Sequence, residues 1–294
     1  MAKNNRYRIQ PNIAKKLGLT LNKNNRYRLD SFTENEYLKK YKHIKAKRLY
    51  FDIETSPNIV YSWRIGWNIT LHPDNIIDER KIICICWKWE DEDKVHYSTW
   101  DKNQDDKKCL EDFVKVANQA DELIAHNGDR FDIKWIRTRC IFNRVPMLNH
   151  YKTLDTLKKA KSGFNFNSNK LDYIARFLGV GSKMETGGFD LWVDCMKGDK
   201  KALKKMVEYC QQDCVVLEDV YHTLQSYIKP NTHQGVIYGG DKCDCVNCAS
   251  ENTTLFKTEV TASGTIKRML LCNDCGSNFF VSNRSYINDR LSPL

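Results

Sequence analysis

The sequence predicts a mixed α/β fold for the central part of the chain, with one sheet covered by helices. Three observations support this: apolar segments of strand length, longer segments with helical periodicity, and the order in which the two follow each other. The strands are expected at residues 49–53, 82–89, 95–100 and 123–126. The helices are expected at residues 109–120, 133–142, 171–178 and 201–228. Strands 82–89 and 95–100 are expected to pair antiparallel.

Length and composition limit the class of protein. A chain of 294 residues suggests about two domains, and a hydrophobic content of 41% suffices for a core of α/β size. No apolar run reaches the roughly 18 residues of a membrane span, and residues 1–6 lack the apolar core of a signal peptide. We therefore expect a cytoplasmic protein, in the host cytoplasm if it is viral, with no membrane partner.

The net charge of +10 is concentrated at the N-terminus. Residues 1–48 hold 14 of the 47 Lys and Arg residues but only 3 of the 37 Asp and Glu residues. A concentrated positive segment indicates nucleic acid or an anionic membrane as partner. The alternative is a solvated, partly disordered tail. The rest of the chain is close to neutral.

This basic segment contains an internal repeat. Residues 3–9, KNNRYRI, recur as residues 23–29, KNNRYRL. Between the copies, residues 12–20 predict a short amphipathic helix, and Thr33 with Glu36 has the spacing of a capping box for a second helix. The segment is therefore either a helix-turn-helix or an arm that folds on a partner. In both cases the expected phosphate contacts are the repeat arginines Arg6, Arg8, Arg26 and Arg28.

Three acidic motifs carry the chemistry. Asp52 and Glu54 lie at the end of an apolar strand, Asp132 follows a strand end, and Asp213 lies in a helix. Burying an unpaired carboxylate is expensive, and bound metal ions offset that cost. Four convergent carboxylates suit two hard divalent cations, which in turn suit cleavage of phosphodiesters.

The spacing within the motifs is consistent with one shared site. Asp52 and Glu54 are two apart on a strand, so both side chains face the same side of the sheet. Tyr209 and Asp213 are four apart on a helix and share one face. These residues meet only if strand 49–53 lies beside the helix that contains Asp213. Each carboxylate taken alone has a simpler explanation, as a turn cap or a solvated helix residue.

The central part resembles the DnaQ-like, RNase H-fold 3′–5′ exonucleases of the DEDD type, over roughly residues 49–228. The motifs that carry the resemblance are Asp52-Ile53-Glu54, Asn127 to Asp132, and Tyr209 to Asp213. They are similar to those of the proofreading domain of family B DNA polymerases and of stand-alone relatives in phages, bacteria and archaea. The tyrosine places the chain in the tyrosine subclass. Asp155-Thr156, residues 170–172 and Gly181-Ser182-Lys183 also look like stand-alone members.

The resemblance implies roles for these residues. Asp52 would bridge two Mg²⁺ or Mn²⁺ ions, while Glu54 and Asp213 would complete the site of the ion that carries the attacking water. Asp132 would help to hold the second ion, and Tyr209 would orient the water. The two ions would lie about 4 Å apart. The matching asparagine, Asn127, would contact the terminal nucleotide.

The C-terminal residues 242–294 predict a zinc ribbon. Cys245-x-x-Cys248 and Cys272-x-x-Cys275 have the pattern of a four-cysteine zinc site, with Cys243 as an alternative to Cys245. Residues 255–260 and 265–271 alternate like the strands of a hairpin with its turn at Ser263-Gly264. A single structural Zn²⁺ is expected rather than a catalytic one. Residues 230–241, with three glycines, are expected to be a linker.

The sequence thus predicts a metal-dependent 3′–5′ exonuclease acting on DNA, on a single strand or a frayed 3′ end. Because no polymerase motif follows residue 213, proofreading would occur in trans, with a replication or repair protein as the expected partner. The alternatives are a 3′–5′ exoribonuclease, a non-catalytic nucleic-acid-binding protein, and a structure-specific endonuclease. Intact Asp52, Glu54, Asp132, Tyr209 and Asp213 argue against a non-catalytic protein.

Overall fold

The computed structural model describes residues 47–90 and 92–291. The predicted basic helical segment, its repeat and the arginines Arg6, Arg8, Arg26 and Arg28 lie outside these residues. The strands are β1 (Arg48–Thr55), β2 (Ile59–Val60), β3 (Ile76–Asp78), β4 (Ile82–Trp89), β5 (His96–Thr99), β6 (Glu122–Ala125), β7 (Thr153–Asp155), β8 (Thr253–Val260), β9 (Ile266–Cys272) and β10 (Asn278–Ser282). The α-helices are α3 (Lys107–Ala117), α4 (Asp132–Asn143), α5 (Thr156–Gly163), α6 (Leu171–Leu178), α7 (Asp190–Met196), α8 (Lys200–Leu224), α9 (Gln234–Ile237) and α10 (Asn283–Tyr286).

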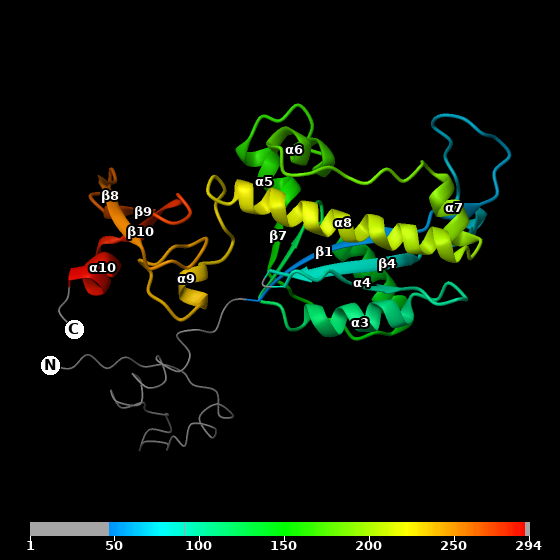
Figure 1. The fold of residues 1–294 in the computed structure, drawn as a ribbon, viewed down its shortest axis with the longest axis horizontal. Helices are drawn as coiled ribbons and strands as arrows, with labels where there is room; N and C mark the ends of the chain where they lie inside the picture. Colours follow the sequence, from blue (N-terminus) through cyan, green and yellow to red (C-terminus); the bar gives the residue numbers. More distant parts are fainter. Residues whose placement is uncertain (1–46, 91, 292–294) are drawn as a thin grey trace, which may run out of the picture.

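A five-stranded mixed sheet forms the centre of the molecule, in the order β5-β4-β1-β6-β7. Strand β1 pairs antiparallel with β4 and parallel with β6, and β6 pairs parallel with β7. The long helix α8 crosses one face of the sheet, while α3 and α4 lie on the other (Figure 1). This confirms the predicted mixed sheet flanked by helices, including the antiparallel pairing of β4 and β5.

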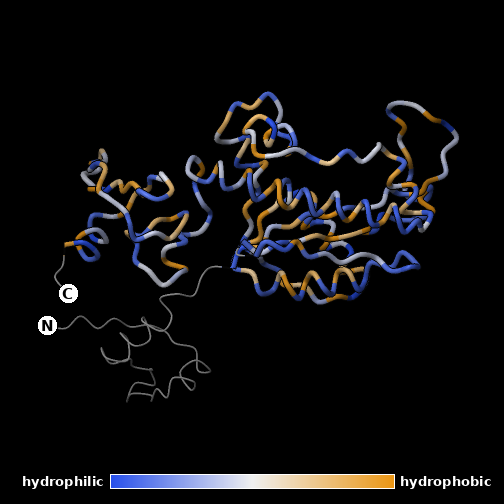
Figure 2. The backbone as a smooth tube through the Cα atoms, in the orientation of Figure 1, coloured by the Kyte–Doolittle hydropathy of each residue, from blue (hydrophilic) through white to orange (hydrophobic). Residues whose placement is uncertain are grey.

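Strand β1 is apolar because it is buried on both faces. Leu49, Phe51 and Ile53 pack in the core under α3 and α4, whereas Tyr50 packs in the core formed by α5, α6 and α8. Because side chains alternate along a strand, Asp52 and Glu54 lie on the same face as Tyr50. The alternation therefore directs both carboxylates towards α8. Hydrophobic residues occur along the strands of this central sheet and on the helices that cover it (Figure 2).

Helix α8 begins at an N-cap aspartate, Asp199, whose side chain accepts hydrogen bonds from the backbone N–H groups of Lys201 and Ala202. Its buried face includes Met206, Cys210 and Asp213. The sequence pattern predicted a helix end at residue 228, but the helix ends at Leu224 and residues 225–228 form a turn. No helix in the described residues is both long and apolar enough to cross a lipid bilayer.

Several elements were not predicted because they are short. Strand β7 has three residues, and the β2–β3 hairpin is held by few backbone pairs. Helices α5 and α7 have eight and seven residues, too few for a clear helical periodicity. Strand β7 nevertheless completes the edge of the sheet beside β6.

The C-terminal part contains a second sheet, in the order β10-β9-β8. Strands β8 and β9 form the predicted hairpin, and β10 adds a third strand. The expected linker at residues 230–241 instead includes α9. The N–H groups of Gln234 and Gly235 donate to the carbonyls of Val246 and Cys245, at 3.0 and 3.1 Å. Residues 234–237 therefore pack onto the C-terminal sheet module instead of forming a free connection.

Candidate active site

Strand β1 and helix α8 bring three of the predicted carboxylates together. Oxygen atoms of Asp52, Glu54 and Asp213 lie within 4.8 Å of one another. Asp52 and Glu54 are partly buried on β1, and Asp213 is buried on α8. The condition stated for the motifs, that strand and helix lie side by side, is thus met by the fold.

Asp132 contacts the backbone of the same strand. It is the first residue of α4, it is buried, and its Oδ1 accepts a hydrogen bond from the Ile53 N–H at 3.2 Å. The N-terminal end of a helix favours a negative charge, which makes this a suitable place for a carboxylate. Asp132 therefore contacts the β1 backbone at Ile53, the residue between Asp52 and Glu54.

The four carboxyl groups disfavour one another's ionised forms. Burial, followed by the neighbouring Cys210 and the charges of Asp132, Asp213 and Glu54, raises the pKa of Asp52 well above its usual range. Burial and the charge of Asp213 raise the pKa of Glu54 to about 8. Burial raises the pKa of Asp132 to about 7. Burial also raises the pKa of Asp213, although Lys183 opposes the shift. The cluster is therefore short of positive charge.

One cation already reaches the cluster. The Lys183 ammonium donates to Asp213 Oδ2 and, at 3.1 Å, to the Tyr209 hydroxyl oxygen. Burial works to lower the pKa of Lys183, but the charges of Asp213 and Asp52 outweigh it and raise the pKa. Burial and the charge of Asp213 raise the pKa of Tyr209 to about 12, so the phenol stays protonated at neutral pH. Lysine and tyrosine thus share one side of the carboxylate cluster.

The residues present fit hard divalent cations. All the donor atoms are carboxylate oxygens, the ligand type that Mg²⁺ and Mn²⁺ prefer. Asp213 Oδ1 is buried and has no hydrogen-bond partner among the described residues. A buried carboxylate oxygen without a partner is costly, and a metal ion would satisfy it. Asp52, Glu54 and Asp213 could therefore hold one ion, with Asp132 available to a second.

A cluster of three thiols contacts Asp52 through Cys210. Cys84, Cys86 and Cys210 are fully buried, and their sulfur atoms lie within 4.8 Å of one another. The Cys210 S–H donates to the Asp52 carbonyl oxygen at 3.4 Å. Cys210 and Cys214, which lie on either side of the third motif's residues 211–213, are both buried in the core.

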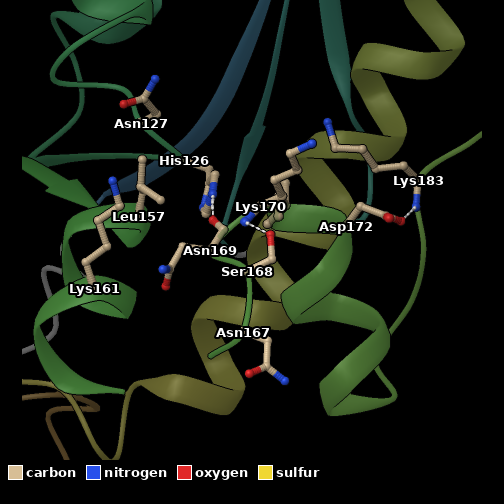
Figure 3. Close-up of a pocket in the computed structure, with 11 residues that line it drawn as sticks. His126, Asn127, Leu157, Lys161, Asn167, Ser168, Asn169, Lys170, Asp172 and Lys183 are labelled. Atoms are coloured by element: carbon tan, nitrogen blue, oxygen red, sulfur yellow. Dashed lines mark hydrogen bonds between the residues drawn. The ribbon is translucent and has the colours of Figure 1, made fainter. Parts of the chain in front are cut away.

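An open pocket of about 670 Å³ adjoins the cluster, with Lys183 on its wall (Figure 3). Asn127 lines it in a left-handed conformation, with φ of 70°. The backbone N–H of Asn127 donates to Asp155 Oδ1 at 3.0 Å. The neighbouring residue, His126, is hydrogen-bonded to Thr156 Oγ1 and to the Asn169 carbonyl oxygen, both at 2.9 Å. The walls are rich in amide and ammonium groups, which suits a polar, anionic ligand.

Two contributions were not assigned from sequence. Lys183 was singled out in the sequence only as part of Gly181-Ser182-Lys183, and its ammonium group contacts Tyr209 and Asp213. Asp155 holds the second motif in place, because its side chain accepts hydrogen bonds from the backbone N–H groups of Asn127 and Asp129. The same side chain is the N-cap of α5. Lys183 lies in an irregular segment between α6 and α7, where no periodicity shows the direction of a side chain.

Comparison with known proteins assigns the fold. Residues 77–225, about half of the chain, match the family model described as the RNase H superfamily. The chain belongs to the RNase H superfamily. The matched residues of this superfamily domain include Asp132, Lys183, Tyr209 and Asp213, whereas β1 with Asp52 and Glu54 lies before the match.

A solved structure is also similar to this RNase H superfamily chain. It is the family B DNA polymerase from the hyperthermophilic archaeon Pyrobaculum calidifontis, with a TM-score of 0.48 and 15% sequence identity. The match covers 61% of this chain and 24% of the polymerase chain, so it spans about a quarter of that enzyme. No protein with a curated description matches the chain.

Outside the part matched to the RNase H superfamily lies a second cluster of possible metal ligands. The sulfur atoms of Cys245, Cys248, Cys272 and Cys275 all lie within 4.8 Å of one another. Two pairs are in contact, Cys245 with Cys275 at 3.5 Å and Cys248 with Cys272 at 3.6 Å. The backbone N–H groups of Asn247 and Cys248 point to Cys245 Sγ, at 3.4 and 3.5 Å.

These contacts favour a thiolate at Cys245. Hydrogen bonds from Cys248 lower the pKa of Cys245 to about 5, against the effect of burial. Cys243 is buried nearby but is not part of the cluster, so the geometry favours Cys245 over Cys243. Four converging thiols suit tetrahedral Zn²⁺.

Proposed function

We propose that the protein is a metal-dependent 3′–5′ exonuclease of the DEDD type, tyrosine subclass, which hydrolyses phosphodiester bonds of DNA. The observation that carries the proposal is the convergence of Asp52, Glu54 and Asp213 within 4.8 Å, with Asp132 bonded to the same strand. The membership of the RNase H superfamily supports it. The substrate proposed is a single strand or a frayed 3′ end.

Each residue then has a defined part. Two Mg²⁺ ions, when bound, would stabilise the attacking and leaving oxygens of an in-line displacement. Asp52, Glu54 and Asp213 would hold the ion on the side of the attacking water, and Asp132 would help to hold the ion on the side of the leaving oxygen. The Tyr209 hydroxyl oxygen accepts from Lys183, and the hydroxyl group also hydrogen-bonds Asp213, so it lies beside the carboxylates, where it would orient the attacking water. The Lys183 ammonium, which lies beside Asp213 and lines the pocket, would contact the phosphate.

The open pocket supports the exonuclease reading. Its volume of about 670 Å³ lies within the range of small-molecule sites and has room for a nucleotide. Asn127 lies on its wall, and Asn169 Oδ1 is buried without a hydrogen-bond partner in the described residues. Such an acceptor suits an amino group of a terminal base.

An exoribonuclease is the second candidate, because Asn169 Oδ1 can equally accept a hydrogen bond from a ribose 2′-OH. The C-terminal module is proposed to be a zinc ribbon with one structural Zn²⁺, held by Cys245, Cys248, Cys272 and Cys275. The basic segment 1–48 is proposed to contact phosphates.

The test uses 5′-labelled single strands of DNA and RNA, with and without Mg²⁺. The expected product is a ladder that shortens from the 3′ end and requires the metal. A circular single strand, which has no 3′ end, should stay intact. Cutting of the circle would identify an endonuclease, and a ladder from RNA alone would identify an exoribonuclease. Binding without any cleavage would favour the non-catalytic protein.

A further inference from the structure

The connection between β1 and β4 carries a set of apolar side chains with no cover. We define residues 61–71 as the aromatic loop, which contains Tyr61, Trp63, Ile65 and Trp67. The side chains of Trp63, Ile65 and Trp67 are 95% or more exposed. Single exposed apolar residues are ordinary, but several adjacent ones mark an interaction site.

The ends of this loop are fastened. Strands β2 and β3 pair antiparallel at its base. The Tyr61 N–H donates to the Asn75 carbonyl oxygen at 2.9 Å, and the Asn75 side-chain amide donates to the Tyr61 carbonyl oxygen at 3.1 Å. Beyond this base the chain projects from the molecule, as the blue loop of Figure 1 shows. The fold therefore presents these side chains to the outside instead of packing them.

The loop is a direct continuation of the strand that carries the proposed metal ligands. Strand β1 ends at Thr55, and Trp63 follows Glu54 by nine residues. Nine residues reach at most about 32 Å, even when fully extended. A nucleic-acid strand held at Glu54 can therefore pass the loop within a few nucleotides of the cleaved end.

The charge of the loop suits a polyanion. Residues 57–73 contain no Asp or Glu, and Arg64 lies between Trp63 and Ile65. Arg64 is exposed, as are the indole rings on both sides of it. Alternating aromatic and cationic groups on an exposed surface are typical of single-strand binding, where bases stack on the rings and arginine contacts phosphate.

We propose that the aromatic loop is a stacking platform for the bases of a single strand whose 3′ end lies at the carboxylates. This inference rests on the proposed function, and it adds a binding surface outside the active-site pocket. Trp63 and Trp67 supply the stacking faces, and Arg64 supplies a phosphate contact. The platform holds any sequence, because every base has a flat face.

The experiment separates binding from cleavage. Binding of a 5′-fluorescein-labelled single strand is measured by anisotropy in the Asp213→Ala background, in EDTA, where no strand is cut. Trp63→Ala and Trp67→Ala should each weaken binding about tenfold, since one stacked base contributes about that much. Trp63→Phe should retain most of the affinity. Ile141→Ala, which removes another highly exposed apolar side chain at the far end of α4, should change nothing.

A second strand tests the contact itself. The Asp213→Ala protein should bind a strand with abasic sites along its length more weakly than it binds the normal strand. Adding Trp63→Ala and Trp67→Ala to that protein should weaken its binding to the abasic strand only slightly. Unchanged binding of both variants to the normal strand, or losses as large on the abasic strand, would overturn the inference. Because this measurement needs no catalysis, a protein that fails to cleave but shows the loop-dependent loss would refute the exonuclease and leave the platform standing.

Discussion

The two ligand clusters of this protein are built on opposite principles. The carboxylate cluster lies at the edge of a large apolar core, to which β1 and β4 contribute on both faces of the sheet and α8 on one. The four-cysteine cluster is itself a large part of its core. The buried residues around it are Cys243, Cys245, Leu270, Cys272, Phe279 and Val281, half of them cysteines.

This difference shows what each cluster contributes to the fold. The carboxylates repel one another, so the core must hold them together and metal relieves a local cost. The thiols lie in a module too small for a sufficient apolar core. There a bound metal would supply the stability that the burial of apolar side chains cannot. Removing metal should therefore leave the first region folded and the second unfolded.

The largest effect is expected from loss of zinc. Protein purified under reducing conditions should contain about one tightly bound zinc, and Cys245→Ser with Cys248→Ser should release it. The C-terminal module should then unfold, because structural zinc contributes about 10 kcal/mol or more in small zinc modules. Residues 49–229 should still unfold cooperatively, as measured by calorimetry and limited proteolysis.

The matched control is Cys243→Ser. This cysteine is buried in the same module but lies outside the four-sulfur cluster. Zinc content should stay at about one per chain. If Cys243→Ser loses zinc while Cys245→Ser keeps it, the ligand assignment is wrong.

Next in size is the loss of activity on removal of a carboxylate. Asp213→Ala should reduce cleavage by at least about a hundredfold, since electrostatic stabilisation of the transition state is typically worth that. The fold should stay intact, because the variant removes a repelling charge. Asp219→Ala, a partly exposed carboxylate on the same helix, should cleave at the parental rate. Equal cleavage rates for the two variants would contradict the assignment of Asp213 to the active site.

The metal-free protein should become less stable as the pH rises. In the folded state the pKa of Glu54 is raised to about 8 and that of Asp132 to about 7, above their ordinary values of 4.5 and 3.8. Unfolding then releases protons between about pH 4 and pH 8, so stability is highest at the low end of this window and decreases through it. We expect Tm in EDTA to fall by about 5 °C from pH 5 to pH 8.

Mg²⁺ should reverse that loss, with a larger rise in Tm at pH 8 than at pH 5, because only ionised carboxylates bind the ion. Glu54→Gln should flatten the pH profile in EDTA. A Tm in EDTA that increases from pH 5 to pH 8 would contradict the mutual repulsion of the carboxylates.

The parts of this comparison that could be predicted from sequence are those with a local signal. The apolar run of β1 and the spacing of Asp52 and Glu54 identify both a strand and the face that carries the carboxylates. The two Cys-x-x-Cys pairs predict the second cluster in the same way. In both regions a pattern within a few residues indicates which neighbouring side chains act together, while the approach of the distant ligands depends on the fold.

The parts that could not be predicted depend on distant contacts. Helix α9 arises because Gln234 and Gly235 bond to the carbonyls of Val246 and Cys245, and nothing within the segment 230–241 indicates this. Lys183 reaches Tyr209 and Asp213 from an irregular segment. Such placements follow from the assembled fold.

The smallest effect expected concerns Tyr209, and it tests whether the carboxylate region contains more than metal ligands. Its phenol keeps its proton, since burial and Asp213 raise its pKa to about 12, and its oxygen accepts from Lys183 at 3.1 Å. Tyr209→Phe removes the remaining O–H donor and leaves every carboxylate in place. We expect the cleavage rate to fall by about tenfold at saturating Mg²⁺, a loss on the order of one hydrogen bond. The Mg²⁺ concentration for half-maximal rate should stay the same, because no ligand is lost. Lys183→Met is the informative partner variant, since it removes the group that fixes the direction of the phenol. If Tyr209→Phe instead raised the Mg²⁺ requirement, the tyrosine would belong to the metal site and not to the water.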